Sequence, residues 1–117
     1  MEIKNFKDLR VWQKGKELAL KIYSLTSVFP KEECYGLTSQ MRRSSVSIPC
    51  NIAESFNRYY SKEYRRFLYI AQGSCAELET QIELAHDLNY IVDNQYIEIL
   101  ESVDYESRML NNLIKKL

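Results

Sequence analysis

Hydrophobic residues recur every three or four positions along most of this chain, which is the period of an α-helix that packs on one side. The pattern predicts four helices, over residues 6–28, 34–57, 61–89 and from residue 93 to the C-terminal end. The third is the most regular, because its apolar positions alternate steps of four and three, as in left-handed helix bundles. Its predicted core residues are Tyr64, Leu68, Ala71, Cys75, Leu78, Ile82 and Ala85.

The other three segments carry similar apolar stripes. The first has Val11, Gly15, Leu18, Ile22, Leu25 and Phe29. The second has Leu37, Met41, Ile48, Ile52 and Phe56, and the fourth has Tyr96, Leu100, Val103, Leu110 and Leu113. The connections are short, so neighbouring helices are antiparallel. The sequence therefore predicts an all-α fold, an up-down-up-down antiparallel four-helix bundle in a single domain over residues 1–117.

Polar residues and a proline mark the expected helix ends. Asn5 or Asp8 can cap the first helix, and Ser61 can cap the third, because their side chains accept hydrogen bonds from free backbone N–H groups. Pro30 ends the first helix, since the residue before a proline is pushed out of the helical region.

Pro49 lies inside the second predicted helix, where a proline costs roughly 3 kcal/mol because it removes one hydrogen bond. We expect the helix to be kinked near Pro49. Two explanations remain open: the helix splits at Ile48, or nearby serines bond the freed backbone groups. The serines concerned are Ser44, Ser45 and Ser47.

Charge is unevenly distributed although the net charge is zero. Residues 42–66 carry six Lys or Arg against two Asp or Glu, and residues 67–117 carry three against nine. In an antiparallel pair of helices, Arg42 and Arg43 come level with Glu77, and Glu54 comes level with Arg65. We therefore interpret these residues as structural and expect ion pairs between the helices, with Glu77 or Glu79 as the partner of the arginines. Pro49 and Asn51 are assigned the same structural role.

Composition excludes several classes of protein. Three Gly residues leave little material for a phosphate-binding loop, and no apolar run approaches the roughly 20 residues of a membrane span. The first residues lack the apolar core of a signal peptide, so we expect a cytoplasmic protein with no membrane association. Cys34, Cys50 and Cys75 are widely spaced, and we predict no disulfide among them.

Glu83 and His86 have the Glu-x-x-His spacing of di-iron bundles. Such a site needs two of these motifs, and the chain has one histidine, so we expect neither a metal nor another cofactor. A serine or cysteine nucleophile would also need a histidine base with an oriented partner, and none is evident. We expect a protein that is not an enzyme, with His86 partly exposed beside acidic neighbours.

The turn between the second and third helices is the best candidate for a binding site. It interleaves cations with tyrosines, which offer charge to phosphates and flat rings to unpaired bases. The candidate residues are Arg58, Tyr59, Tyr60, Lys62, Arg65 and Arg66. The alternative is a solvated turn whose tyrosines pack on the bundle end or on a neighbouring subunit.

Several blocks of the chain, in order, resemble the proteins encoded in intervening sequences of bacterial 23S ribosomal RNA genes. They are residues 6–14, then 29–30 with Glu33 and 35–37, then 40–54, 66–68, 71–74 and 77–79. Ser55 and Ser44 depart from the pattern, which usually has Gly and Ala there. Relatives are four-helix bundles that assemble into homopentamers, and the family has no established enzyme activity.

The resemblance implies a homo-oligomer. Surplus apolar stripes fit this: Trp12, Ala19 and Tyr23 on the first helix, and Phe67, Ile70, Leu84, Leu88 and Ile91 on the third. The family is similar to accessory proteins of diversity-generating retroelements, which bind nucleic acid and a reverse transcriptase. We therefore expect a scaffold associated with RNA or with a nucleic-acid enzyme, the alternative being a protein–protein scaffold that binds no nucleic acid.

Overall fold

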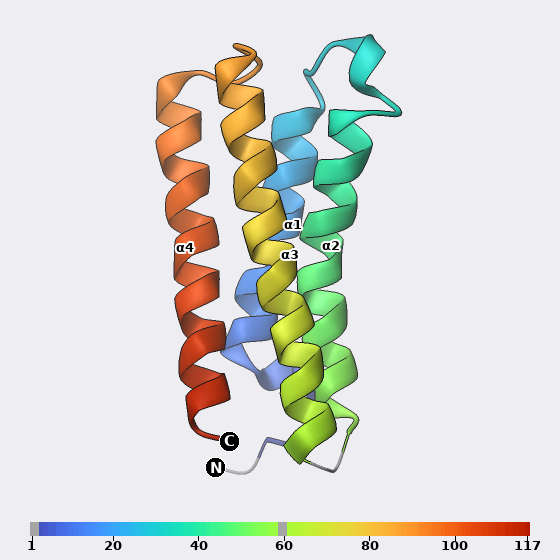
Figure 1. Cartoon of the computed structure of the whole chain (residues 1–117), viewed down its shortest axis with the longest axis vertical. Helices are drawn as coiled ribbons and strands as arrows, with labels where there is room; N and C mark the ends of the chain where they lie inside the picture. The colour runs from blue at the N-terminus through green and yellow to red at the C-terminus, as the bar shows by residue number, and fades with distance from the viewer. Residues whose placement is uncertain (1–2, 59–60) are drawn as a thin grey trace.

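Four long helices follow one another in this computed structural model, which describes residues 3–58 and 61–117. They are α1 (Arg10–Thr26), α2 (Leu37–Phe56), α3 (Ser61–Asp87) and α4 (Asp93–Lys115), with two short 3-10 helices, η1 (Phe6–Asp8) before α1 and η2 (Lys31–Glu33) before α2. The helices lie side by side along the longest dimension of the molecule, which is 44 Å. The start of α1 and the end of α4 lie at the same end of the bundle (Figure 1). No strand occurs in the described ranges, and the predicted up-down-up-down bundle is confirmed.

The first helix is shorter than the 6–28 expected. Leu9 is extended, with φ −75° and ψ 126°, and separates η1 from α1. Asn5 caps η1, where its Oδ1 accepts a hydrogen bond of 2.9 Å from Lys7 N. Neither Asn5 nor Asp8 caps α1, whose N-cap residue is Leu9. The side chain of Ser61, the expected cap of α3, lies outside the described part of the structure.

The predicted cores of α1, α2 and α3 are largely confirmed. Leu18, Ile22, Met41 and Leu78 are among the most buried side chains, while Leu25, Phe56 and Tyr64 are half-buried at the edges. The prediction for α4 was correct at Val103 and Leu110 and one residue off at Leu100 and Leu113, which are half-buried beside the buried Ile99 and Ile114. Its buried face is formed by Ile99, Val103, Glu106, Leu110 and Ile114.

Pro49 lies within α2 without dividing it, because the helix runs unbroken from Leu37 to Phe56. The expected split at Ile48 was therefore wrong, while the bend stays a prediction. The expected repair by serines was also wrong. Ser45 Oγ donates to Arg42 O at 2.9 Å, and the hydroxyls of Ser44 and Ser47 pair with side chains of α3.

The side chain of Glu33 links the start of α2 to the connection between α3 and α4. Glu33 Oε1 accepts a hydrogen bond of 3.1 Å from Leu37 N, and its Oε2 accepts one of 2.8 Å from Tyr90 Oη. The bonds from Leu37 and then Tyr90 lower the pKa of Glu33. A Cβ on Gly36 would lie 2.7 Å from Glu33 Oε1, so a side chain at position 36 would displace the carboxylate.

Within the described ranges, none of the helices has both the length and the apolarity needed to cross a bilayer.

Candidate nucleic-acid-binding site

The first turns of α3 carry an open hollow of about 550 Å³, here called the basic hollow. It is lined by Lys62, Glu63, Arg65, Arg66, Tyr69 and Ile70. Three of its six lining residues are therefore cations and one is an acid. They share one side because residues three or four apart on a helix are neighbours. The structure thus brings together Lys62, Arg65 and Arg66, three of the six residues that the sequence indicated.

Arg58 does not line the basic hollow. Its guanidinium carbon lies 5.0 Å from the centre of the Phe67 ring, and that of Arg66 lies 5.5 Å from the same ring. Such cation–π contacts are worth about 0.5–1 kcal/mol at exposed sites. Arg58 also forms an ion pair with Glu54 one turn earlier. Its position is therefore set by the chain itself. Tyr59 and Tyr60 lie outside the described residues.

Two of the lining cations also have partners within the chain. Arg65 Nη2 donates a hydrogen bond of 2.8 Å to Leu117 O, and Arg66 Nη1 lies 3.4 Å from Glu63 Oε2. The predicted ion pair between Glu54 and Arg65 was wrong, because each side chain has a different partner. Both observed contacts are exposed, where a single ion pair contributes little stability. These arginines can therefore exchange partners with a phosphate at low cost.

Tyr69 is a feature of this site that sequence reasoning missed. Its side chain is 54% exposed and lines the basic hollow beside Ile70, which is 41% exposed. The signal was present, since Tyr69 lies four residues after Arg65 on the same helix and so faces the same side. An exposed aromatic ring beside cations is the combination that binds unpaired bases.

Arg42 is structural, but its partner is α1 rather than an acid of α3. Its Nε donates to Thr26 Oγ1 at 2.9 Å, and its Nη2 donates to Tyr23 O at 3.3 Å. Its guanidinium carbon lies 4.6 Å from the centre of the Tyr23 ring. The expected ion pair of Arg42 with Glu77 or Glu79 was therefore wrong, because the side chain leaves α2 on the α1 side.

Arg43 is exposed and forms no ion pair among residues 3–58 and 61–117. Its expected partner Glu77 instead accepts a hydrogen bond of 2.8 Å from Ser44 Oγ. Ser74 Oγ donates to Ser47 Oγ at 2.9 Å, and Asn51 Nδ2 donates to Ser47 O at 2.8 Å. The contact of Asn51 with Ser47 is therefore made inside α2 and does not join two helices.

Glu106 is a buried carboxyl group at the centre of the bundle that sequence reasoning also missed. Its side chain is 1% exposed, and neither oxygen has a hydrogen-bond partner in the described part of the chain. Burial raises the pKa of Glu106 to about 8, so the group is mainly protonated at neutral pH. A Cβ on Gly15 would lie 2.7 Å from Glu106 Oε2, which explains the glycine at that position of α1.

The cysteines occupy three different environments, and none is disulfide-bonded. Cys75 is buried in the core, where burial, followed by the charges of Glu106 and Glu79, raises the pKa of its thiol to about 12. Cys34 and Cys50 are exposed. A thiol that resists ionisation is a poor nucleophile, so Cys75 is part of the packing.

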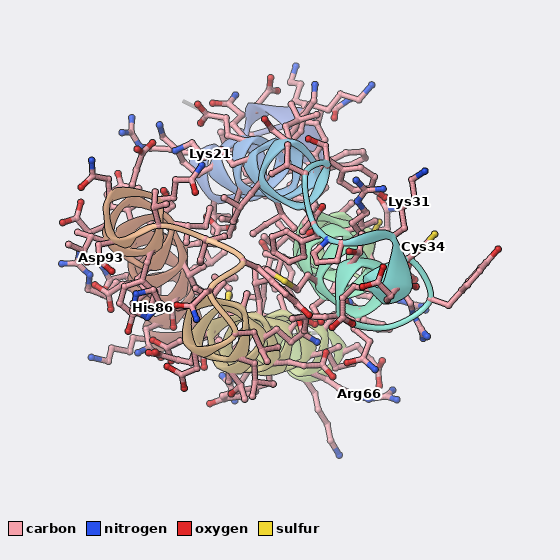
Figure 2. The ribbon with its side chains drawn as sticks, turned by 90° about the horizontal axis from the view of Figure 1, so that it is seen from above. Lys21, Lys31, Cys34, Arg66, His86 and Asp93 are labelled. Carbon is pink, nitrogen blue, oxygen red and sulfur yellow. The ribbon has the colours of Figure 1, made fainter. Side chains whose placement is uncertain are left out.

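His86 joins α3 to α4 at the end of the bundle opposite to the basic hollow. His86 lies beside Asp93 (Figure 2), with its Nε2 2.8 Å from Asp93 Oδ1. Its ring stacks on Tyr96 with the ring centres 3.8 Å apart. Tyr96 in turn donates to Glu83 Oε1 at 2.6 Å, a bond that raises the pKa of Tyr96. The expectation of a partly exposed histidine beside acids is confirmed. In the described residues, no three His, Cys, Asp or Glu side chains are grouped as metal ligands.

The fold and these contacts define a class: small antiparallel four-helix bundles with a polar α2–α3 seam and a basic end. Within that class, the model of the 23S rRNA-intervening sequence protein family matches residues 7–112, so the chain belongs to this family. It is also similar to a solved protein of unknown function from the S23 ribosomal protein family of Bacteroides thetaiotaomicron VPI-5482. The two share 27% identity and a TM-score of 0.81, over 90% of this chain and 98% of the other. No curated protein matches.

Proposed function

We propose that this protein is a non-enzymatic, cytoplasmic homo-oligomer whose basic hollow binds single-stranded nucleic acid, with RNA as the first candidate. The single observation that carries the proposal is the arrangement of Lys62, Arg65 and Arg66 around the exposed ring of Tyr69. Cations attract the phosphates of any strand, and a ring stacks with any base, so the site is suited to a flexible single strand rather than to one sequence.

Assembly would multiply a weak site. A single hollow offers three cations, but several copies on one oligomer can contact one strand together, which raises avidity without new contacts. The resemblance to the family makes a homopentamer the expected assembly. A nucleic-acid enzyme that works on the same strand is the proposed partner class.

The outer face of α3 supports the oligomer. Leu84 on α3 and Leu88 just after its end are 50% and 51% exposed and lie on the side of the helix that carries Gly73. Ile70, the third exposed residue of the expected stripe, lines the basic hollow instead. A Cβ on Gly73 would meet nothing within 4 Å, so no contact within the described part of the chain requires glycine there. Glycine inside a helix costs roughly 0.5–1 kcal/mol relative to alanine, and close approach of another backbone is a common reason for it. The rest of the expected stripe is covered, because Ile91 is buried and Phe67 is half-buried.

The binding proposal is tested by an electrophoretic shift assay with single-stranded RNA over a range of salt concentrations. We expect the Arg65→Glu, Arg66→Glu double variant to bind far more weakly than the native protein. The slope of log affinity against log salt should fall by about 0.7 for each phosphate that the variant no longer neutralises. The matched control is Lys21→Glu, Lys31→Glu, which makes the same charge change in the second half of α1 and in η2, toward the end of the bundle opposite to the start of α3 (Figure 1). Equal binding by the native protein and the Arg65, Arg66 variant would reject this site.

A protein–protein scaffold that binds no nucleic acid is the second candidate. The observation in its favour is that Arg58, Arg65 and Arg66 already have partners within the chain. This function predicts no RNA shift even at low salt, where phosphate contacts are strongest.

A further inference from the structure

A polar cleft of about 400 Å³ lies between α2 and α3, away from the basic hollow. This serine cleft is lined by Gln40, Arg43, Ser44, Ser47, Glu77 and Gln81. Each of the six is polar or charged, whereas the seam between two bundle helices is normally filled with apolar side chains. The volume is within the usual range for small-molecule sites, roughly 300–1,000 Å³. A lining of this kind fits a small and highly polar ligand.

Some polar groups of the serine cleft are already engaged. Ser44 Oγ donates to Glu77 Oε1 at 2.8 Å, and Ser47 Oγ pairs with Ser74 Oγ at 2.9 Å. The first bond fixes the position of the Glu77 carboxylate on α3. Arg43 places a cation on the facing helix, and the two opposite charges form no ion pair with each other in the described residues. The cleft thus holds one cation and one anion that are separated from each other.

Gln81 brings a buried and unpaired acceptor to the wall of the serine cleft. Its side chain is 6% exposed, and its Oε1 is buried with no hydrogen-bond partner among residues 3–58 and 61–117. An unmet buried acceptor of this kind costs about 1–3 kcal/mol. The last torsion of a glutamine side chain is broad and roughly two-fold, so a half-turn offers the oxygen to the cleft at little cost. A ligand with an N–H donor would satisfy it.

We propose that the serine cleft binds a free α-amino acid with a polar side chain. The carboxylate of the ligand would accept hydrogen bonds from Arg43, and its ammonium group would donate to Glu77 and to Gln81 Oε1. Charge-assisted hydrogen bonds are the strong ones, and arginine is suited to a planar carboxylate. A nucleic acid does not fit this site, because Glu77 repels phosphates. The inference is therefore independent of RNA binding at the basic hollow.

The test is a ¹H–¹⁵N NMR titration of the full chain with L-glutamine in the millimolar range. We expect shift changes confined to the backbone amides around Ser44, Ser47 and Gln81 and to the side-chain amide of Gln81. Two analogues each lack one charge: L-glutaminamide has no carboxylate, and N-acetyl-L-glutamine has no ammonium group. We expect both to bind at least tenfold more weakly than L-glutamine.

Variants assign each charge to its partner. Arg43→Gln should abolish the preference for L-glutamine over L-glutaminamide and keep the preference over N-acetyl-L-glutamine, while Glu77→Gln should do the reverse. Glu79→Gln, the matched control, removes the same charge from an exposed position two residues away and should change neither preference.

Three results would overturn the proposal. They are no shift changes, equal affinity for all three ligands, or shift changes spread over the chain together with a change in mass, which would place the effect at a subunit contact. Loss of RNA binding in the Arg65, Arg66 variant would leave this result untouched, so the two proposals fail separately.

Discussion

Replacing Glu106 with glutamine should remove the pH dependence of stability that comes from this buried carboxyl group. The carboxyl group is buried without a hydrogen-bond partner in the described residues, and its pKa rises from the ordinary 4.5 to about 8. The folded state therefore binds this proton more tightly than the unfolded state does. The stability that depends on the proton is fully present below pH 4.5 and is lost as the pH rises toward 8.

The size of this effect follows from the shift. Each pKa unit corresponds to about 1.4 kcal/mol, so the stability that depends on this proton has fallen by about 3 kcal/mol at pH 7 and by about 5 kcal/mol above pH 8. Glutamine has nearly the same shape and does not titrate. Any constant cost of the amide is the same at every pH, so the difference between the two proteins isolates the carboxyl group.

The assay is urea denaturation of the native protein and Glu106→Gln at pH 5 and pH 7, at one protein concentration. From pH 5 to pH 7 the native protein should lose roughly 2–3 kcal/mol of unfolding free energy that the variant keeps. Glu101→Gln, an exposed change on the same helix, should follow the native pH dependence. Parallel stability curves for native protein and Glu106→Gln would refute the burial of an unpaired carboxyl group.

Further predictions concern packing, capping, thiol reactivity and assembly. Gly15→Ala should lower the unfolding free energy in urea by about 1–3 kcal/mol, because its Cβ would lie 2.7 Å from Glu106 Oε2; unchanged stability would contradict this contact. Tyr90→Phe should raise the pKa of Glu33 toward 4.5 in a carboxyl NMR titration, because it removes one of the bonds that lower it. Iodoacetamide at pH 8 should modify Cys34 and Cys50 in the folded protein but Cys75 only after unfolding, as read by mass spectrometry. Gly73→Leu should lower the mass of the oligomer while helicity by circular dichroism stays intact, and Asn112→Leu, exposed on α4, should leave the mass unchanged.

The bundle could be predicted because its periodic signal is strong. The core of α3 was correct from Leu68 to Ala85, where every step of four or three falls on an apolar residue. The α4 prediction was correct at Val103 and Leu110 but missed Glu106, which occupies the seam between them. A charged residue there interrupts the apolar stripe, so the pattern shifted to the half-buried Leu100 and Leu113. In the sequence, the only sign that Glu106 is buried and neutral is its position three residues after Val103 and four before Leu110.

Side-chain partners were harder to predict than helices. The antiparallel arrangement brought α2 and α3 together as expected, yet the residue paired with Glu77 is Ser44 and not an arginine. Sequence gives the level of a residue along a helix only approximately, and its direction around the helix decides which neighbour it meets. Arg42 faces α1 for this reason, and Tyr69 joins the basic hollow although it lies beyond the turn.

The central claim is that the exposed face of α3 is covered by copies of the same chain, which brings several basic hollows together. Light scattering of the native protein at micromolar concentration tests this most directly. We expect a mass of about 70 kDa, five times the 13.9 kDa chain. A mass of one chain, unchanged on raising the concentration, would contradict the account.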